Sequence, residues 1–139
     1  QSIKNLLSAE IPTFFPTGND RNYNRINWPS CIPESFAIGA GSRNGIELVS
    51  NSHQLLTDFY ALGNTKATYP GNVVKNASGT SVSAQIAASQ WIVLKQSKPG
   101  YTVQQITDLI SKTSTKINRG KKFPNSFGNL FDLGKALNG

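Results

Sequence analysis

The stretch SGTSVSAQIAASQWIVLK, residues 78–95, decides how this chain is interpreted. From Ser83 to Lys95 it has almost no polar helical face, which predicts a helix buried in the core of something larger than a thin two-layer domain. Pro99-Gly100 follows and is expected to end this helix. The apolar residues of the stretch are Ile86, Ala87, Trp91, Ile92 and Leu94.

Ser78-Gly79-Thr80-Ser81, directly before this helix, can be interpreted in two ways. Serine and glycine before a helix are most often a simple cap. A serine at a helix start also gains free backbone amides and the positive end of the helix dipole, so Ser81 could support an oxyanion. The residues alone leave both readings open.

A second polar point, Thr17-Gly18-Asn19, follows the apolar segment Ile11–Phe15, which predicts a strand. The Asn19 side chain could donate a hydrogen bond to charge that develops during acyl transfer. Asparagine after glycine is also common in ordinary turns.

The remaining elements follow from periodicity and capping residues. Helices are predicted at Ile3–Leu7, after Thr102 with Gln105 in a capping box, and after Asp132. Residues 20–33 predict a long surface loop that Trp28 pins to the body. Short strands are expected at residues 35–40, 46–49 and 55–60.

Composition excludes several function classes. The single cysteine, Cys31, permits no intrachain disulfide, and one histidine, His53, provides no zinc cluster. No apolar run is long enough to span a membrane, and no leader opens the chain. The net charge is +7, with much of the excess in residues 112–122, which we interpret as a solvated surface with no nucleic acid partner.

Five ordered motifs together resemble the subtilase family of serine peptidases, and the resemblance covers nearly the whole chain. These motifs are Pro16-Thr17-Gly18-Asn19, the segment Trp28–Ala40, Ala61-Leu62-Gly63, Ser78-Gly79-Thr80-Ser81, and the segment Phe127–Leu137. The family supplies an oxyanion residue in a strand-Gly-Asn segment and a nucleophile in Gly-Thr-Ser.

The resemblance implies a fold and a set of site residues. Residues 1–139 would be the C-terminal part of an α/β, three-layer subtilisin-like domain with a mostly parallel sheet. Ser81 would be the nucleophile, and Asn19 and the Ser81 amide would be the oxyanion donors. Pro16, Thr17 and Gly18 would border the substrate pocket. No metal ligand or cofactor is identified, although the family makes calcium possible.

The chain also departs from the family pattern. Gln85 and Ile86 replace a proline and a histidine, and Leu62 replaces a proline. The family's aspartate and histidine precede the strand-Gly-Asn segment and are absent here. His53 and Asp58 lie where the family keeps no catalytic group, so we do not assemble them into a triad with Ser81.

Two main functions remain. The first is a serine endopeptidase that works through an acyl-enzyme once an upstream segment, or a second chain, supplies Asp and His; the chain alone is then expected to be inactive. The second is an inactive subtilase-like domain that binds peptides or partners, and a basic binding module is a minor third. The family resemblance favours a secreted or extracytoplasmic protein. Half of a parallel sheet leaves an edge uncovered, so further polypeptide is expected to pack against it.

Overall fold

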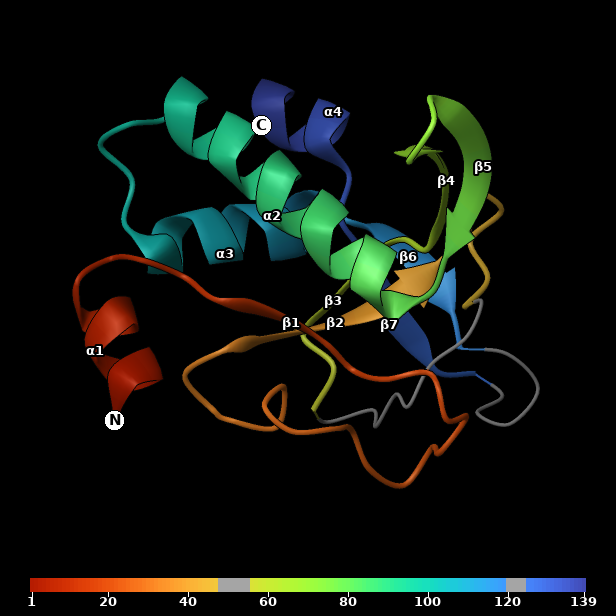
Figure 1. Ribbon diagram of the computed structural model, residues 1–139. Helices are drawn as coiled ribbons and strands as arrows, with labels where there is room; N and C mark the ends of the chain where they lie inside the picture. Colours follow the sequence, from red (N-terminus) through yellow and green to blue (C-terminus); the bar gives the residue numbers. More distant parts are fainter. Residues whose placement is uncertain (48–55, 120–124) are drawn as a thin grey trace.

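The computed structural model describes residues 1–47, 56–119 and 125–139, and its centre is a five-stranded sheet (Figure 1). Four strands are parallel and the last, β6, is antiparallel to β7. The order across the sheet is β1 (Phe14–Pro16), β2 (Phe36–Gly41), β3 (Phe59–Leu62), β7 (Phe127–Leu130) and β6 (Thr115–Asn118). The predicted α/β class with a mostly parallel sheet is confirmed.

Three helices cover one face of this sheet, and a short fourth lies near the N-terminus (Figure 1). The covering helices are α2 (Thr80–Ser97), α3 (Val103–Thr113) and α4 (Leu133–Asn138), and the fourth is α1 (Ser2–Ser8). Their apolar side chains meet Ile38, Phe59 and Ala61 of the sheet in one buried cluster. This face therefore holds the main core.

Helix α2 is covered on one side only within the described residues. Ala87, Trp91 and Leu94 are buried against the sheet. Ile92, which the sequence also predicted to be buried, is 57% exposed, and the neighbouring Val93 is 42% exposed, because nothing described here packs on that side. The helix also begins at Thr80, earlier than expected.

The opposite face of the sheet is organised around Tyr60, which is completely buried. Its ring fits because Gly39 and Gly128, on the two neighbouring strands, have no side chains: a Cβ atom there would lie 2.5 Å and 2.3 Å from ring carbons. The Arg119 guanidinium lies 5.4 Å from the ring centroid. The two glycines are therefore required by close packing rather than by backbone conformation.

A two-stranded antiparallel hairpin, which the sequence did not predict, joins the sheet to α2. It consists of β4 (Asn64–Tyr69) and β5 (Val73–Ser78). Gly71 at its turn has a φ of +80°, a conformation that suits glycine. Because most of its residues are exposed on both faces, the hairpin shows no alternation of polar and apolar residues in the sequence.

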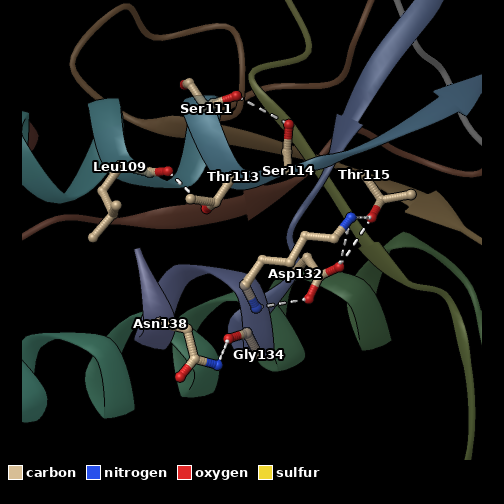
Figure 2. Close-up of polar contacts among 9 residues, drawn as sticks. Leu109, Ser111, Thr113, Ser114, Thr115, Asp132, Gly134 and Asn138 are labelled. Atoms are coloured by element: carbon tan, nitrogen blue, oxygen red, sulfur yellow. Dashed lines mark hydrogen bonds and ion pairs between the residues drawn. The ribbon is translucent and has the colours of Figure 1, made fainter.

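Both predicted helix caps are confirmed. Gln105 N donates to Thr102 Oγ1 at 3.2 Å, and Thr102 N donates to Gln105 Oε1 at 2.8 Å, which completes the capping box. At α4, Asp132 Oδ1 accepts from the backbone of Lys135 at 3.1 Å. Figure 2 shows Asp132 also reaching Thr115, whose hydroxyl donates to Oδ2 at 2.9 Å. The cap thus ties α4 to β6.

Several sequence expectations are corrected. Trp28 does not pin its loop, because its side chain is 79% exposed. The first strand occupies Phe14–Pro16 rather than 11–15; directly before it, Thr13 O accepts from Phe36 N of β2 at 2.8 Å. The strand expected at 55–60 is β3, which begins only at Phe59 and runs to Leu62, so its predicted start was too early. Residues 48–49 of the strand expected at 46–49, and residues 120–122 of the basic stretch, lie outside the described residues.

Candidate functional site

Ser81 lies in the first turn of α2 and is exposed. Before it, β5 ends at Ser78 and the Gly79 amide donates to Gly63 O at 2.9 Å, which fixes the turn against the end of β3. Gly79 precedes the helix with a φ of +121°, which a side chain would strain. Backbone amides in a first helical turn have no intrahelical acceptor. Among the described residues, that of Ser81 has no acceptor at all.

The structure brings Asn19 to the same turn, although it is about sixty residues away in sequence. Asn19 Oδ1 accepts from Thr80 N at 3.0 Å and from Thr80 Oγ1 at 3.1 Å. Because the oxygen is used in both contacts, the orientation of the amide is determined and Nδ2 remains a donor. Within the described part of the chain, Nδ2 donates to nothing.

The Asn19 amide also lies against Gly79. A Cβ atom on Gly79 would be 3.2 Å from Asn19 Nδ2 and 3.3 Å from Oδ1. Glycine is therefore needed here for its backbone conformation and for the space it leaves. The result is two unused donors at this turn: Asn19 Nδ2, which lies against Gly79 and Thr80, and the Ser81 amide.

The three residues before Asn19 are held in place by the sheet and by Thr80. Pro16 is in register with Ile38 of β2, and the buried Thr17 donates its amide to Ile38 O at 3.1 Å. Gly18, with a φ of +106°, donates its amide to Thr80 Oγ1 at 3.2 Å. All five predicted site residues are thus gathered at the carboxyl ends of β1 and β3.

Thr80 is a site residue that sequence reasoning missed. The sequence assigned no role of its own to Thr80 within the Ser78–Ser81 motif. Its buried hydroxyl nevertheless donates to Asn19 Oδ1 and accepts from Gly18 N. A threonine at the first helical position offered no separate signal, because its partners come from a distant segment.

The electrostatics of this turn favour negative charge. The positive end of the α2 dipole and the unused Ser81 amide lie in this turn, and no acidic residue lies in the first turn of α2. An arrangement of fixed donors around an exposed hydroxyl can stabilise an oxyanion.

Asp58 lies at the other end of the sheet. It directly precedes β3, and its Oδ2 accepts from Ala37 N at 2.8 Å. Burial of its carboxylate raises the pKa, an effect partly offset by backbone hydrogen bonds, although the residue as a whole is exposed. The turn that carries Ser81 lies at the opposite, carboxyl end of β3, so Asp58 does not reach Ser81. His53, the other residue of that rejected triad, lies outside the described residues.

The described residues 1–47, 56–119 and 125–139 meet the requirements of neither a metal site nor a membrane-spanning helix. No group of three or more His, Cys, Asp or Glu side chains there could hold a metal ion. No helix among them is long and apolar enough to cross a membrane.

Comparisons with known proteins agree with this fold. Subtilisin BL of Lederbergia lenta is 25% identical over 118 residues, which is 84% of this chain and 44% of that protein. A thermostable alkaline protease of Halalkalibacterium halodurans is 29% identical over 113 residues, covering 80% of this chain and 30% of that protein. The chain therefore spans less than half the length of these relatives.

Solved structures show the same fold. The patellamide maturation protease PatA superposes with a TM-score of 0.80 at 18% identity, covering 98% of this chain and 53% of that one. The PatG macrocyclase in complex with peptide gives 0.81 at 19% identity, covering 99% and 46%. The family model described as "Subtilase family" matches residues 8–129. The chain belongs to the subtilase family.

Proposed function

We propose that this chain is the part of a subtilisin-like serine endopeptidase that carries the nucleophile, Ser81, and the oxyanion hole. The observation that carries the proposal is the pair of contacts from Thr80 to Asn19 Oδ1, which leaves Nδ2 as a fixed and unused donor beside Ser81. A fixed donor has little reorganisation to undergo when charge develops, which is how an oxyanion hole lowers a barrier.

The proposed reaction is acyl transfer. Ser81 Oγ attacks the carbonyl carbon of the scissile peptide bond while its proton passes to a histidine. The carbonyl oxygen becomes negative and accepts from Asn19 Nδ2 and the Ser81 amide. The C–N bond then breaks as the histidine returns the proton to the leaving amine, and water hydrolyses the acyl-enzyme by the same route.

The histidine and its orienting aspartate would come from an upstream segment of the same protein or from a second chain. An open surface supports this. Within the described residues β1 pairs only with β2, and the buried Thr13 Oγ1 and Trp91 Nε1 make no hydrogen bond. Ile11 and Ile92 are 51% and 57% exposed. Parallel sheets are normally buried on both faces, so we propose that further polypeptide covers this edge.

The substrate would be a peptide or protein whose residue before the scissile bond lies against Pro16, Thr17 and Gly18. We further propose a secreted or extracytoplasmic location on the family resemblance. No cofactor is proposed; calcium is suggested by the family resemblance alone, which identifies no ligand in this chain.

Steady-state hydrolysis of a peptide anilide by the protein that contains this chain tests the proposal. Ser81→Ala should abolish turnover. Asn19→Leu should lower kcat by about 10²–10³ with little change in KM, the effect that removing the side-chain donor has in subtilisin. Asn24→Leu, an exposed asparagine in the next loop, is the matched control and should change neither constant. Full turnover by Ser81→Ala contradicts the proposal.

The second candidate is an inactive subtilase-like domain that binds a peptide or partner. Gln85, Ile86 and Leu62 favour it, because they replace family residues next to the nucleophile and in the Ala-x-Gly segment. Helix α2 nevertheless begins regularly, with Val82 N and Ser83 N both donating to Gly79 O. Saturable peptide binding without any turnover by the native protein would select this candidate.

A further inference from the structure

A pocket that does not include Ser81 lies beyond the carboxyl ends of β3 and β7. Its volume is about 450 Å³, within the range of small-ligand sites. Open α/β sheets commonly bind ligands outside the carboxyl ends of their strands. The lining is formed by α2, by the end of β3, by the start of β6, by the segment from β7 into α4, and by the loop after β2. Its apolar residues are Leu62, Leu130, Phe131 and Leu133.

Two polar side chains of this pocket have unused hydrogen-bonding capacity. Gln90 Oε1, from the middle of α2, is buried and accepts no hydrogen bond within the described residues. An acceptor buried without a donor costs about 1–3 kcal/mol, so a ligand that donates to it gains affinity. Arg43, from the loop after β2, forms no ion pair or hydrogen bond with the described part of the chain.

The other polar residues of the lining are already engaged. Asp132 caps α4, accepts from Thr115 Oγ1 and lies 3.4 Å from Lys135 Nζ. The Thr115 hydroxyl also accepts from Lys135 Nζ at 2.8 Å. The negative charge of Asp132 is therefore paired within this network. The unpaired positive charge of Arg43 favours an anionic ligand.

The geometry points to a binding site for the C-terminal residue of a peptide that ends in an apolar side chain and a free carboxylate. The side chain would lie on Leu62 and Leu130, a backbone N–H would donate to Gln90 Oε1, and the carboxylate would bind Arg43. An arginine fork matches a carboxylate with two parallel hydrogen bonds. An apolar group, an N–H donor and an anion occur together in one N-acylated amino acid.

One part of this inference rests on the proposed function. Hydrolysis of a peptide bond leaves a free carboxylate on one product, so the site would take products of the proposed activity whose last residue is apolar. Gln90 and Ser81 belong to the same helix, which connects the two sites physically. Binding itself needs no Ser81 chemistry and can be measured without it.

Isothermal titration calorimetry with acetyl-Ala-Ala-Leu tests the site, using the protein that contains this chain with Ser81→Ala to prevent turnover. The free acid should bind saturably, and the peptide with a C-terminal amide at least about tenfold more weakly, because it lacks the charged hydrogen bonds. Acetyl-leucine is titrated in parallel. Binding of acetyl-leucine as tight as that of the tripeptide would show that the site recognises a single N-acylated amino acid, and weaker binding would show that it recognises the C-terminal end of a peptide.

Variants locate the binding. Arg43→Gln and Gln90→Leu should each weaken the free acid at least about tenfold, since each removes one required partner. Arg25→Gln, an exposed arginine of the 20–33 loop, should leave binding unchanged. No binding of the free acid, equal binding of acid and amide, or unchanged binding by Arg43→Gln overturns the inference. Ser81 reactivity in Arg43→Gln should equal that of the parent, so failure here is distinguishable from failure of the proposed peptidase.

Discussion

Thr80→Val tests whether the threonine hydroxyl positions Asn19. The substitution keeps the branched shape of a completely buried side chain and removes one oxygen. That oxygen donates to Asn19 Oδ1 at 3.1 Å and accepts from Gly18 N at 3.2 Å. One contact to Asn19 survives, from the Thr80 amide.

The magnitude follows from these contacts. The lost hydrogen bond to Asn19 and the Gly18 amide left without an acceptor should lower the free energy of unfolding by about 1–3 kcal/mol. With one of two anchors gone, Asn19 Nδ2 is held less precisely, and kcat should fall by about 10- to 100-fold. KM should change little, because the donor acts mainly in the transition state.

Two assays check this: urea unfolding followed by circular dichroism, and peptide anilide hydrolysis by the protein that contains the chain. Thr80→Ser keeps the hydroxyl and is the matched control, expected to stay close to the parent in kcat. If Thr80→Val and Thr80→Ser show the same kcat, the hydroxyl does not position Asn19 and the reasoning is refuted.

Three further changes test the fold. Gly128→Ala should lower the free energy of unfolding by about 1–3 kcal/mol, because its Cβ would lie 2.3 Å from the buried Tyr60 ring. The control is Gly134→Ala at an exposed position, where the nearest atom to the new Cβ, Asp132 Oδ1, is 3.6 Å away. Thermal unfolding should show this control to be neutral or stabilising. Asp132→Ala should cost about 1 kcal/mol in urea at pH 7 through loss of the α4 cap, and Asp132→Asn less. Hydrogen bonds from Lys135 and Thr115 lower the pKa of Asp132 below 3.8. The contribution of Asp132 to the free energy of unfolding should therefore be complete above pH 3.8 and be lost as the pH falls through the folded-state pKa. If Asp132→Ala lowers the free energy of unfolding as much at pH 2 as at pH 7, this reasoning is wrong. Burial raises the pKa of Asp58, so ionisation of this carboxyl opposes folding as the pH rises. Asp58→Asn should therefore raise the free energy of unfolding at pH 7, and the gain should disappear below pH 3.8. A lower free energy of unfolding for Asp58→Asn at pH 7 would refute the raised pKa.

Local sequence signals predicted the helices well. Thr102 with Gln105 and Asp132 each mark a helix start through contacts within three residues, so their caps could be read directly. The apolar run before Lys95 likewise predicted α2. The β4–β5 hairpin gave no signal, because its faces are both largely exposed and no apolar alternation results.

Long-range packing could not be read in the same way. The contact between Asn19 and Thr80 depends on the order of the strands, and only the family resemblance suggested that the two segments meet. The slot that Gly39 and Gly128 leave for Tyr60 also depends on strand order, and neither glycine stands out in the sequence. Trp28 shows the opposite error, since a large aromatic residue was assumed to pack and is exposed.

Labelling with a fluorophosphonate probe tests the central claim most directly, because the probe reacts only with a serine that is activated as a nucleophile. The protein that contains this chain, with and without its upstream polypeptide, is labelled and the modified residue is mapped by mass spectrometry. The account predicts modification of Ser81 when the upstream segment is present, and none in Ser81→Ala. No modification of Ser81 in either state would contradict it and would favour a subtilase-like domain without catalytic activity.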